Sequence, residues 1–206
     1  MFPYADEEIL QTLRMVEMEN LDIRCVTLGV NLLDCSDRSA DNVAEKLQDL
    51  DGILIPGGFG ERGVSGMVEA VRFAREKHVP FFGICLGLQC AVIEAARNLC
   101  GLEGADSAEI NPDTPHPIIH LMSSQLGQTQ KGGTMRLGAY ACRLTPDTLA
   151  QRAYGTDLVH ERHRHRYEFN DAYRQVFKEH GMRVAGLSRS SSPIGTLAAE
   201  ANWLSE

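Results

Sequence analysis

The segment FFGICLGLQ (residues 81–89) places Cys85 between Gly83 and Gly87, directly after a short apolar run. A buried strand that ends at a cysteine and continues as a helix predicts a nucleophile elbow with a thiol in place of serine. Bulky side chains two residues to either side would collide with adjacent backbone, which explains the glycines. The N-terminus of the helix should favour the thiolate and lower the thiol pKa. A small buried cysteine beside packing glycines is the alternative.

A second glycine turn, IPGGFG (residues 55–60), follows another apolar run. Ligands bind at the carboxyl ends of strands in open α/β sheets, so we expect the two turns to converge on one site. The backbone N–H groups of Gly58 and Leu86 would then form an oxyanion hole for a tetrahedral intermediate. Alone, IPGGFG also fits a plain glycine turn. Together the two turns predict acyl-transfer chemistry at Cys85.

The elements around these turns alternate between helix and strand. Periodicity and capping signals predict helices at residues 5–19, 39–50, 64–74, 87–99 and 171–180, and strands at 22–30, 52–56 and 81–85. Two later segments, GGTMRLGAYACRL and ERHRHRYEFN, are expected to form strands with loops. We therefore predict one α/β domain over residues 1–206, with a three-layer, flavodoxin-like arrangement. Its sheet should be mostly parallel, with helices on both faces.

Composition restricts the class of partner. The formal net charge of −8 over 206 residues argues against nucleic acid or an anionic membrane as a partner. No apolar run approaches the about 20 residues that span a bilayer. Six cysteines without a CxxC pair are typical of reduced thiols, which predicts a cytoplasmic protein.

The segment ERHRHRYEFN (residues 161–170) could recognise a carboxylate. In an extended conformation its three arginines share one face, and two histidines with Tyr167 share the other. An arginine row suits planar recognition of carboxylates, although a solvated basic strand has the same pattern. Three nearby histidines raise the alternative of a metal site: His160, His163 and His165. We expect no metal there, because the alternating arginines would repel a cation and no thiol or carboxylate completes a known spacing.

The motifs PGGFGERG, GICLGLQ, GGTMRLGAY and ERHRHRYEFN resemble, in this order, those of the glutaminase domain of CTP synthases, a group of class I glutamine amidotransferases. The resemblance is strong from residue 51 to 187 and weaker from 4 to 50. It implies that Cys85 attacks the side-chain amide of L-glutamine, forms a glutamyl thioester and releases ammonia. It also implies that Gly58 and Leu86 form the oxyanion hole.

The same resemblance implies further roles in binding the substrate. Four consecutive residues match the segment that lines the glutamine pocket: Leu86, Gly87, Leu88 and Gln89. Glu109 matches a carboxylate that contacts the substrate amino group, and Arg166 with Tyr167 matches the segment that holds the α-carboxylate. Gly133 and Arg136 fall in a loop that resembles a lid through which GTP promotes hydrolysis.

For an intact enzyme, the resemblance implies a synthase (amidoligase) domain that uses ATP, Mg and the ammonia to convert UTP to CTP. It also implies GTP as an effector and assembly into homo-oligomers. No cofactor is expected in the glutaminase domain itself.

The sequence departs from the family at both ends. The family's His-Pro-Glu run, which supplies the catalytic base and its orienting acid, does not follow His180, and the N-terminal residues begin near the first helix. We therefore expect an incomplete domain that alone is a weak or inactive glutaminase. A substitute base at His163 or His165 is disfavoured. The alternatives are a non-catalytic module that binds glutamine or a synthase subunit, and another cysteine hydrolase such as a γ-glutamyl hydrolase. GGTMRLG and ERHRHRYE argue against the hydrolase.

Overall fold

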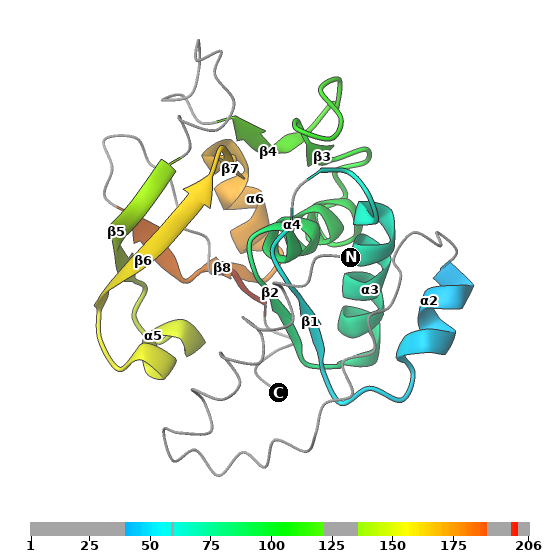
Figure 1. The fold of residues 1–206 in the computed structure, drawn as a ribbon, viewed down its shortest axis with the longest axis horizontal. Helices are drawn as coiled ribbons and strands as arrows, with labels where there is room; N and C mark the ends of the chain where they lie inside the picture. Colours follow the sequence, from blue (N-terminus) through cyan, green and yellow to red (C-terminus); the bar gives the residue numbers. More distant parts are fainter. Residues whose placement is uncertain (1–39, 59, 122–135, 189–198, 202–206) are drawn as a thin grey trace. The chain divides into compact units, whose positions relative to one another are not determined.

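The computed structural model describes residues 40–58, 60–121, 136–188 and 199–201 (Figure 1). The chain divides into two compact units, Met1–Asp34 and Cys35–Glu206, and every described residue belongs to the second. The helix expected at residues 5–19, the strand expected at 22–30 and Gly133 lie outside the described residues.

Two short parallel strands carry the glycine turns. β1 (Ile53–Ile55) pairs with β2 (Phe81–Gly83). α3 (Val64–Lys77) follows the first turn and α4 (Leu86–Asn98) follows the second, and both helices contact both strands (Figure 1). α2 (Ala40–Leu47) contacts α3. The predicted succession of strand, glycine turn and helix is confirmed at both turns.

α4 lies at the centre of the hydrophobic core. Its sequence is rich in alanine and other good helix formers, and every residue from Cys90 to Ala96 is buried. The helix contacts α3 and four strands, β1 to β4. On β1, Ile53 and Ile55 are buried while Leu54, which points to the other face, is exposed. The strand therefore turns one face toward the core.

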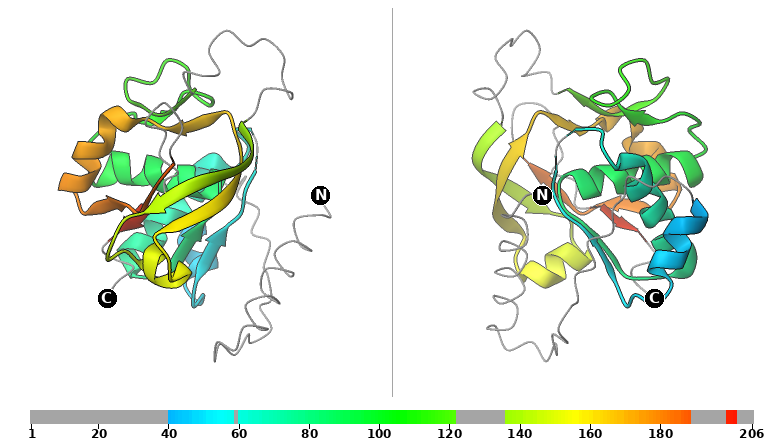
Figure 2. Two further views of the ribbon diagram at one scale, coloured as in Figure 1. Left: turned by 90° about the vertical axis from the view of Figure 1, so that its left-hand side faces the viewer. Right: turned by 45° about the vertical axis from the view of Figure 1, so that its right-hand side comes forward.

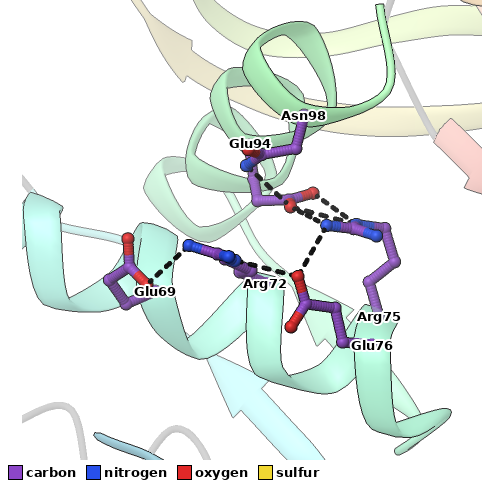
Figure 3. A network of polar contacts seen from close by, with 6 residues as sticks. All are labelled: Glu69, Arg72, Arg75, Glu76, Glu94 and Asn98. Carbon is purple, nitrogen blue, oxygen red and sulfur yellow. Dashed lines mark hydrogen bonds and ion pairs between the residues drawn. The ribbon is translucent and has the colours of Figure 1, made fainter. Parts of the chain in front are cut away.

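A buried ion pair ties α3 to α4 (Figure 3). The Glu94 side chain is 0% exposed, and Arg75 donates to it through Nε at 3.0 and 3.1 Å and through Nη2 at 2.7 Å. Asn98 Nδ2 donates to the same carboxylate at 3.0 Å. Removing a charge from water costs several kcal/mol unless its partners are well placed. Because these donors satisfy the carboxylate, the pair can fix how α3 and α4 lie against each other.

The second half of the chain is built mainly from antiparallel strands. β5 (Arg136–Leu144) runs beside β6 (Leu158–His165), as Figure 2 shows, and beside β9 (Gly186–Ser188). β4 (Pro117–Leu121) pairs with β7 (Tyr167–Phe169) antiparallel and with β3 (Asp106–Ser107) parallel. The remaining elements are α5 (Leu149–Tyr154), η2 (Asp171–Tyr173), α6 (Arg174–Glu179), and the antiparallel pair β8 (Met182–Val184) and β10 (Ala199–Ala201).

These elements agree with the expected fold class. The α/β class and its parallel strands are confirmed, and strands occupy the two segments expected to contain them. The helix predicted at residues 171–180 is present as η2 and α6. Within the described residues, the structure contains no helix with the length and apolar character of a membrane span.

Candidate active site

Cys85 is the N-cap of α4 and has an unusual backbone conformation, with φ 56° and ψ −105°. A positive φ is strained for a residue with a side chain and persists where the surrounding structure enforces it. Here the flanking glycines permit close backbone contact. A Cβ atom on Gly83 would lie 2.6 Å from the Gly87 carbonyl carbon, and one on Gly87 would lie 2.2 Å from the Ile55 oxygen. The structure therefore shows the collision that the glycine spacing predicts.

The two glycine turns meet at the sulfur of Cys85. The backbone N–H groups of Leu86 and Gly58 both donate to this sulfur. Gly57 is also close, since a Cβ built on it would lie 3.8 Å from the sulfur. The Ile84 N–H donates to the Ile55 oxygen at 2.9 Å and so joins the ends of the two strands. The convergence expected from the sequence is confirmed.

The local electrostatics favour the protonated thiol. Burial raises the pKa of Cys85 above the ordinary value of 9.0, and the carboxylate of Glu109 adds a smaller effect in the same direction. The N–H groups of Leu86 and Gly58 oppose the shift without cancelling it. The expectation that the helix N-terminus would leave a lowered pKa is therefore wrong, because loss of solvation outweighs the favourable backbone groups.

A pocket of about 460 Å³, including space open to solvent, lies over the sulfur. It brings together residues that are far apart in the sequence. Those expected from the sequence are Gly58, Cys85, Leu86, Gln89, Glu109, Arg166 and Tyr167. They come from the two glycine turns, the first turns of α4, the loop after β3 and the junction of β6 with β7. The Cys85 thiol, the Glu109 carboxylate and the Arg166 guanidinium therefore share one pocket.

Arg166 lies where the chain passes from one sheet to another. β6 ends at His165 and pairs with β5, whereas β7 begins at Tyr167 and pairs with β4. All three consecutive residues line the pocket, so the strict alternation expected for ERHRHRY stops at His165. The reason is the bend between the two strands. The side chains of residues 162–164 lie outside the described part of the structure.

The guanidinium of Arg166 is suited to an anionic ligand. Its Nε atom is buried and has no hydrogen-bond partner within the part of the chain that the structure describes, which is unusual for a buried donor in a folded protein. Gln89 Nε2 donates to the Tyr167 carbonyl oxygen at 3.4 Å and so connects α4 to this bend. A carboxylate in the pocket would supply an acceptor for Arg166 Nε.

Some expected site residues lie elsewhere. Among the described residues, Gly87 and Leu88 do not line the pocket. Gly87 is a packing residue, because its N–H donates to the Ile84 oxygen at 2.9 Å and its α-carbon lies against Ile55. Arg136 is the first residue of β5, but its side chain lies outside the described part.

Three further residues line the pocket without having been assigned to it from the sequence: Gly60, Ile110 and His165. Each lies within two residues of an expected site residue, so closeness in the sequence could have identified all three. Among the described residues, no three histidine, cysteine, aspartate or glutamate side chains are grouped to hold a metal ion.

Comparison with known proteins identifies the family. The family model for class I glutamine amidotransferases matches residues 18–204. The chain is 56% identical over 170 residues to the CTP synthase of Halalkalibacterium halodurans, which covers 82% of this chain and 31% of that protein. It is 58% identical over 151 residues to the CTP synthase of Prochlorococcus marinus, covering 73% of this chain and 26% of that protein. The chain thus spans less than a third of these relatives.

A solved structure has the same fold. The glutaminase domain of Trypanosoma brucei CTPS with bound acivicin matches with a TM-score of 0.71 and 33% identity, over 82% of this chain and 64% of that chain. The likeness confirms the amidotransferase fold expected from the motifs. With the family match over residues 18–204, it shows that this chain belongs to the class I glutamine amidotransferases.

Proposed function

We propose that this chain binds L-glutamine in the pocket at Cys85 and releases its side-chain nitrogen as ammonia, as the glutaminase part of a CTP synthase. The observation that carries the proposal is the meeting of two backbone donors, from Gly58 and Leu86, at the Cys85 sulfur. In the proposed whole enzyme, the ammonia passes to an amidoligase domain that uses ATP and Mg to convert UTP to CTP. Homo-oligomer assembly and a cytoplasmic location belong to the same proposal.

The pocket can orient glutamine by its two charged groups. Arg166 would bind the α-carboxylate through charge-assisted hydrogen bonds, and its unpartnered Nε supports this role. Glu109, which lines the same pocket, would bind the α-ammonium group. The side-chain amide would then extend toward Cys85. Tyr167 and Gln89 complete the lining beside these groups.

The reaction follows from this orientation. The Cys85 sulfur attacks the amide carbon, and the carbonyl electrons move to the oxygen, where the N–H groups of Gly58 and Leu86 stabilise the negative charge. The C–N bond then breaks and the nitrogen takes up the thiol proton. Ammonia departs, and a glutamyl thioester remains on Cys85. Water subsequently hydrolyses the thioester to glutamate. Because burial raises the pKa of the thiol, a base has to accept its proton during the attack.

We also retain Arg136 and Gly133 as parts of a lid that responds to GTP. The backbone register supports this role for Arg136, because it pairs in the β5–β6 ladder with His165, a residue of the pocket. The first residue of β5 therefore lies beside a residue that lines the site.

Acid-quenched mass spectrometry after mixing the chain with L-glutamine tests the proposal. We expect a glutamyl adduct on the peptide that contains Cys85 and slow release of ammonia, because this chain alone is expected to be a weak glutaminase. Cys85→Ala should form neither product. Ammonia release that survives Cys85→Ala, or a glutamyl adduct on a residue other than Cys85, would contradict glutaminase chemistry at this site.

A second candidate is a module that binds glutamine without transferring its glutamyl group. The raised pKa of Cys85 favours it, because a protonated thiol is a poor nucleophile. Calorimetric titration distinguishes the candidates. Binding of glutamine that persists after alkylation of Cys85, without any adduct on the unmodified protein, would support the binding module.

A further inference from the structure

We propose that Arg97, Asp106 and Ser107 form a positioning chain that holds Glu109 in the pocket and thereby sets the preference for ligands with an α-amino group. The proposal rests on the function above, in which Glu109 contacts the ammonium group of glutamine. The three residues act through the backbone of Glu109 and are not themselves substrate contacts.

The positioning chain begins near the C-terminal end of α4. Arg97 Nε donates to the Ala105 carbonyl oxygen at 2.7 Å, and Arg97 Nη2 pairs with Asp106 Oδ2 at 3.1 Å. One guanidinium therefore holds two consecutive residues at the start of β3. Because α4 starts directly after Cys85, a single helix presents the nucleophile at one end and anchors the segment leading to Glu109 at the other.

Side chain to backbone hydrogen bonds continue the positioning chain to Glu109. The Ser107 N–H donates to Asp106 Oδ1 at 2.8 Å, and the Glu109 N–H donates to Ser107 Oγ at 3.2 Å. Ser107 is 0% exposed. Its carbonyl oxygen also accepts hydrogen bonds from the N–H groups of Ile110 and Asn111, at 3.0 and 2.9 Å. These bonds fix the backbone of the turn at Glu109.

Such an anchor matters because Glu109 is an exposed residue. Exposed ion pairs contribute little, since ordering long side chains offsets much of the attraction. Fixing the backbone in advance removes part of that entropic cost before the ligand arrives. The hydrogen bonds of Asp106 and Ser107 therefore determine how much Glu109 gains from an ammonium group.

Protection of Cys85 from iodoacetamide measures this gain without requiring turnover. The probes are L-glutamine and glutaramate, which keeps the amide and carboxylate but lacks the amino group. Peptide mass spectrometry follows alkylation at Cys85. For the parent chain, we expect half-protection at a lower concentration of glutamine than of glutaramate. Glu109→Gln should remove this difference. The variant therefore serves as the reference for complete loss of the preference for glutamine over glutaramate.

Ser107→Ala removes only the hydroxyl acceptor for the Glu109 N–H. We expect the half-protecting concentration of glutamine to rise about 3-fold to 10-fold, the effect of one lost hydrogen bond, while that of glutaramate stays unchanged. Asp106→Asn, which removes the charge paired with Arg97, should shift the preference in the same direction and serves if Ser107→Ala does not fold.

Thr114→Val is the matched control. Thr114 is also buried, and its hydroxyl donates to the Gly104 oxygen at 2.8 Å and accepts from the His116 N–H at 3.3 Å, within the same part of the chain. It should leave both concentrations unchanged. An amino-group preference that survives both Ser107→Ala and Asp106→Asn would overturn the positioning chain, as would an equal loss in Thr114→Val. Failure of glutamine to protect the parent chain would instead contradict the proposed function.

Discussion

Cys85 has a positive φ at a place where backbone atoms of neighbouring segments approach one another closely. The contacts of Gly83 with Gly87, and of Gly87 with Ile55, hold the elbow closed. The sulfur then receives its two backbone donors as a consequence of local packing. The geometry at this residue therefore depends on the lack of a side chain at Gly83 and at Gly87.

Gly87→Ala tests this dependence. Gly87 lies within α4, where alanine normally stabilises a helix by about 1 kcal/mol, but its new Cβ would overlap the Ile55 oxygen. We expect the collision to dominate and to lower the free energy of unfolding by about 2 kcal/mol, measured by urea denaturation. Gly52→Ala is the control, since its Cβ would lie an ordinary 3.6 Å from the Pro80 oxygen. A Gly87→Ala protein as stable as the parent would contradict the packing role.

The reactivity of Cys85 should depend on pH in a defined direction. Burial raises the pKa of its thiol above 9.0, so alkylation by iodoacetamide should be slow at pH 8 and increase as pH rises beyond 9. Denatured protein should reach its plateau at lower pH. The same shift implies a contribution to stability that is present below pH 9 and declines above it, because the unfolded thiol ionises first.

Glu109→Gln is the matching variant for this pH profile. Its carboxylate contributes to the raised pKa of Cys85, so the variant should react at slightly lower pH than the parent. If the folded parent reached half of its maximal alkylation rate at a lower pH than the denatured chain, burial would not be the factor that sets the pKa of this thiol.

At the scale of elements, α4 connects Cys85 to the rest of the core. It contacts α3 and four strands, and its buried Glu94 receives the guanidinium of Arg75 (Figure 3). α3 follows the turn that carries Gly58, and α4 follows Cys85. The ion pair therefore joins the two helices whose preceding turns meet at the sulfur.

Removing one partner of this pair should be costly. Arg75→Met leaves the buried carboxylate of Glu94 without its main donor, and we expect a loss of about 3–5 kcal/mol in the free energy of unfolding. The double variant Arg75→Met, Glu94→Met should recover most of that loss because no charge remains buried. Arg72→Ala removes an exposed pair, Arg72 Nε with Glu76 Oε1 at 2.9 Å, and should cost less than about 1 kcal/mol. Equal effects of Arg75→Met and Arg72→Ala would contradict this assignment.

Local patterns predicted the two glycine turns and the helices after them, because these features depend on residues adjacent in the sequence. The direction of the Cys85 pKa was not accessible in this way, since burial depends on tertiary packing. The same limit applies to Arg166. Alternation placed it opposite its neighbours, but the crossing from β6 to β7 brings His165, Arg166 and Tyr167 into one pocket. Gly87 was assigned to the pocket by its position in a motif, whereas its contacts assign it to packing.

At the scale of the whole molecule, the described residues assemble the site from segments that no single stretch of sequence contains. The β1–β2 pair supplies the turns, β3 leads to Glu109, and the bend between β6 and β7 supplies Arg166. The likeness to the Trypanosoma brucei glutaminase domain extends over 82% of the chain. The fold shared with that domain therefore brings the Cys85 thiol, the Glu109 carboxylate and the Arg166 guanidinium into one pocket.

Site-resolved labelling with acivicin, the compound bound in that related structure, tests the central claim most directly. Acivicin should modify Cys85 and leave the buried Cys90, Cys100 and Cys142 unmodified, and L-glutamine should slow the labelling. In the Cys85→Ala variant, Cys90, Cys100 and Cys142 should also remain unlabelled. Labelling of Cys90, Cys100 and Cys142 to the same extent as Cys85 would contradict the claim. So would labelling of Cys85 at the same rate with and without glutamine, because it would show that glutamine does not bind beside this thiol.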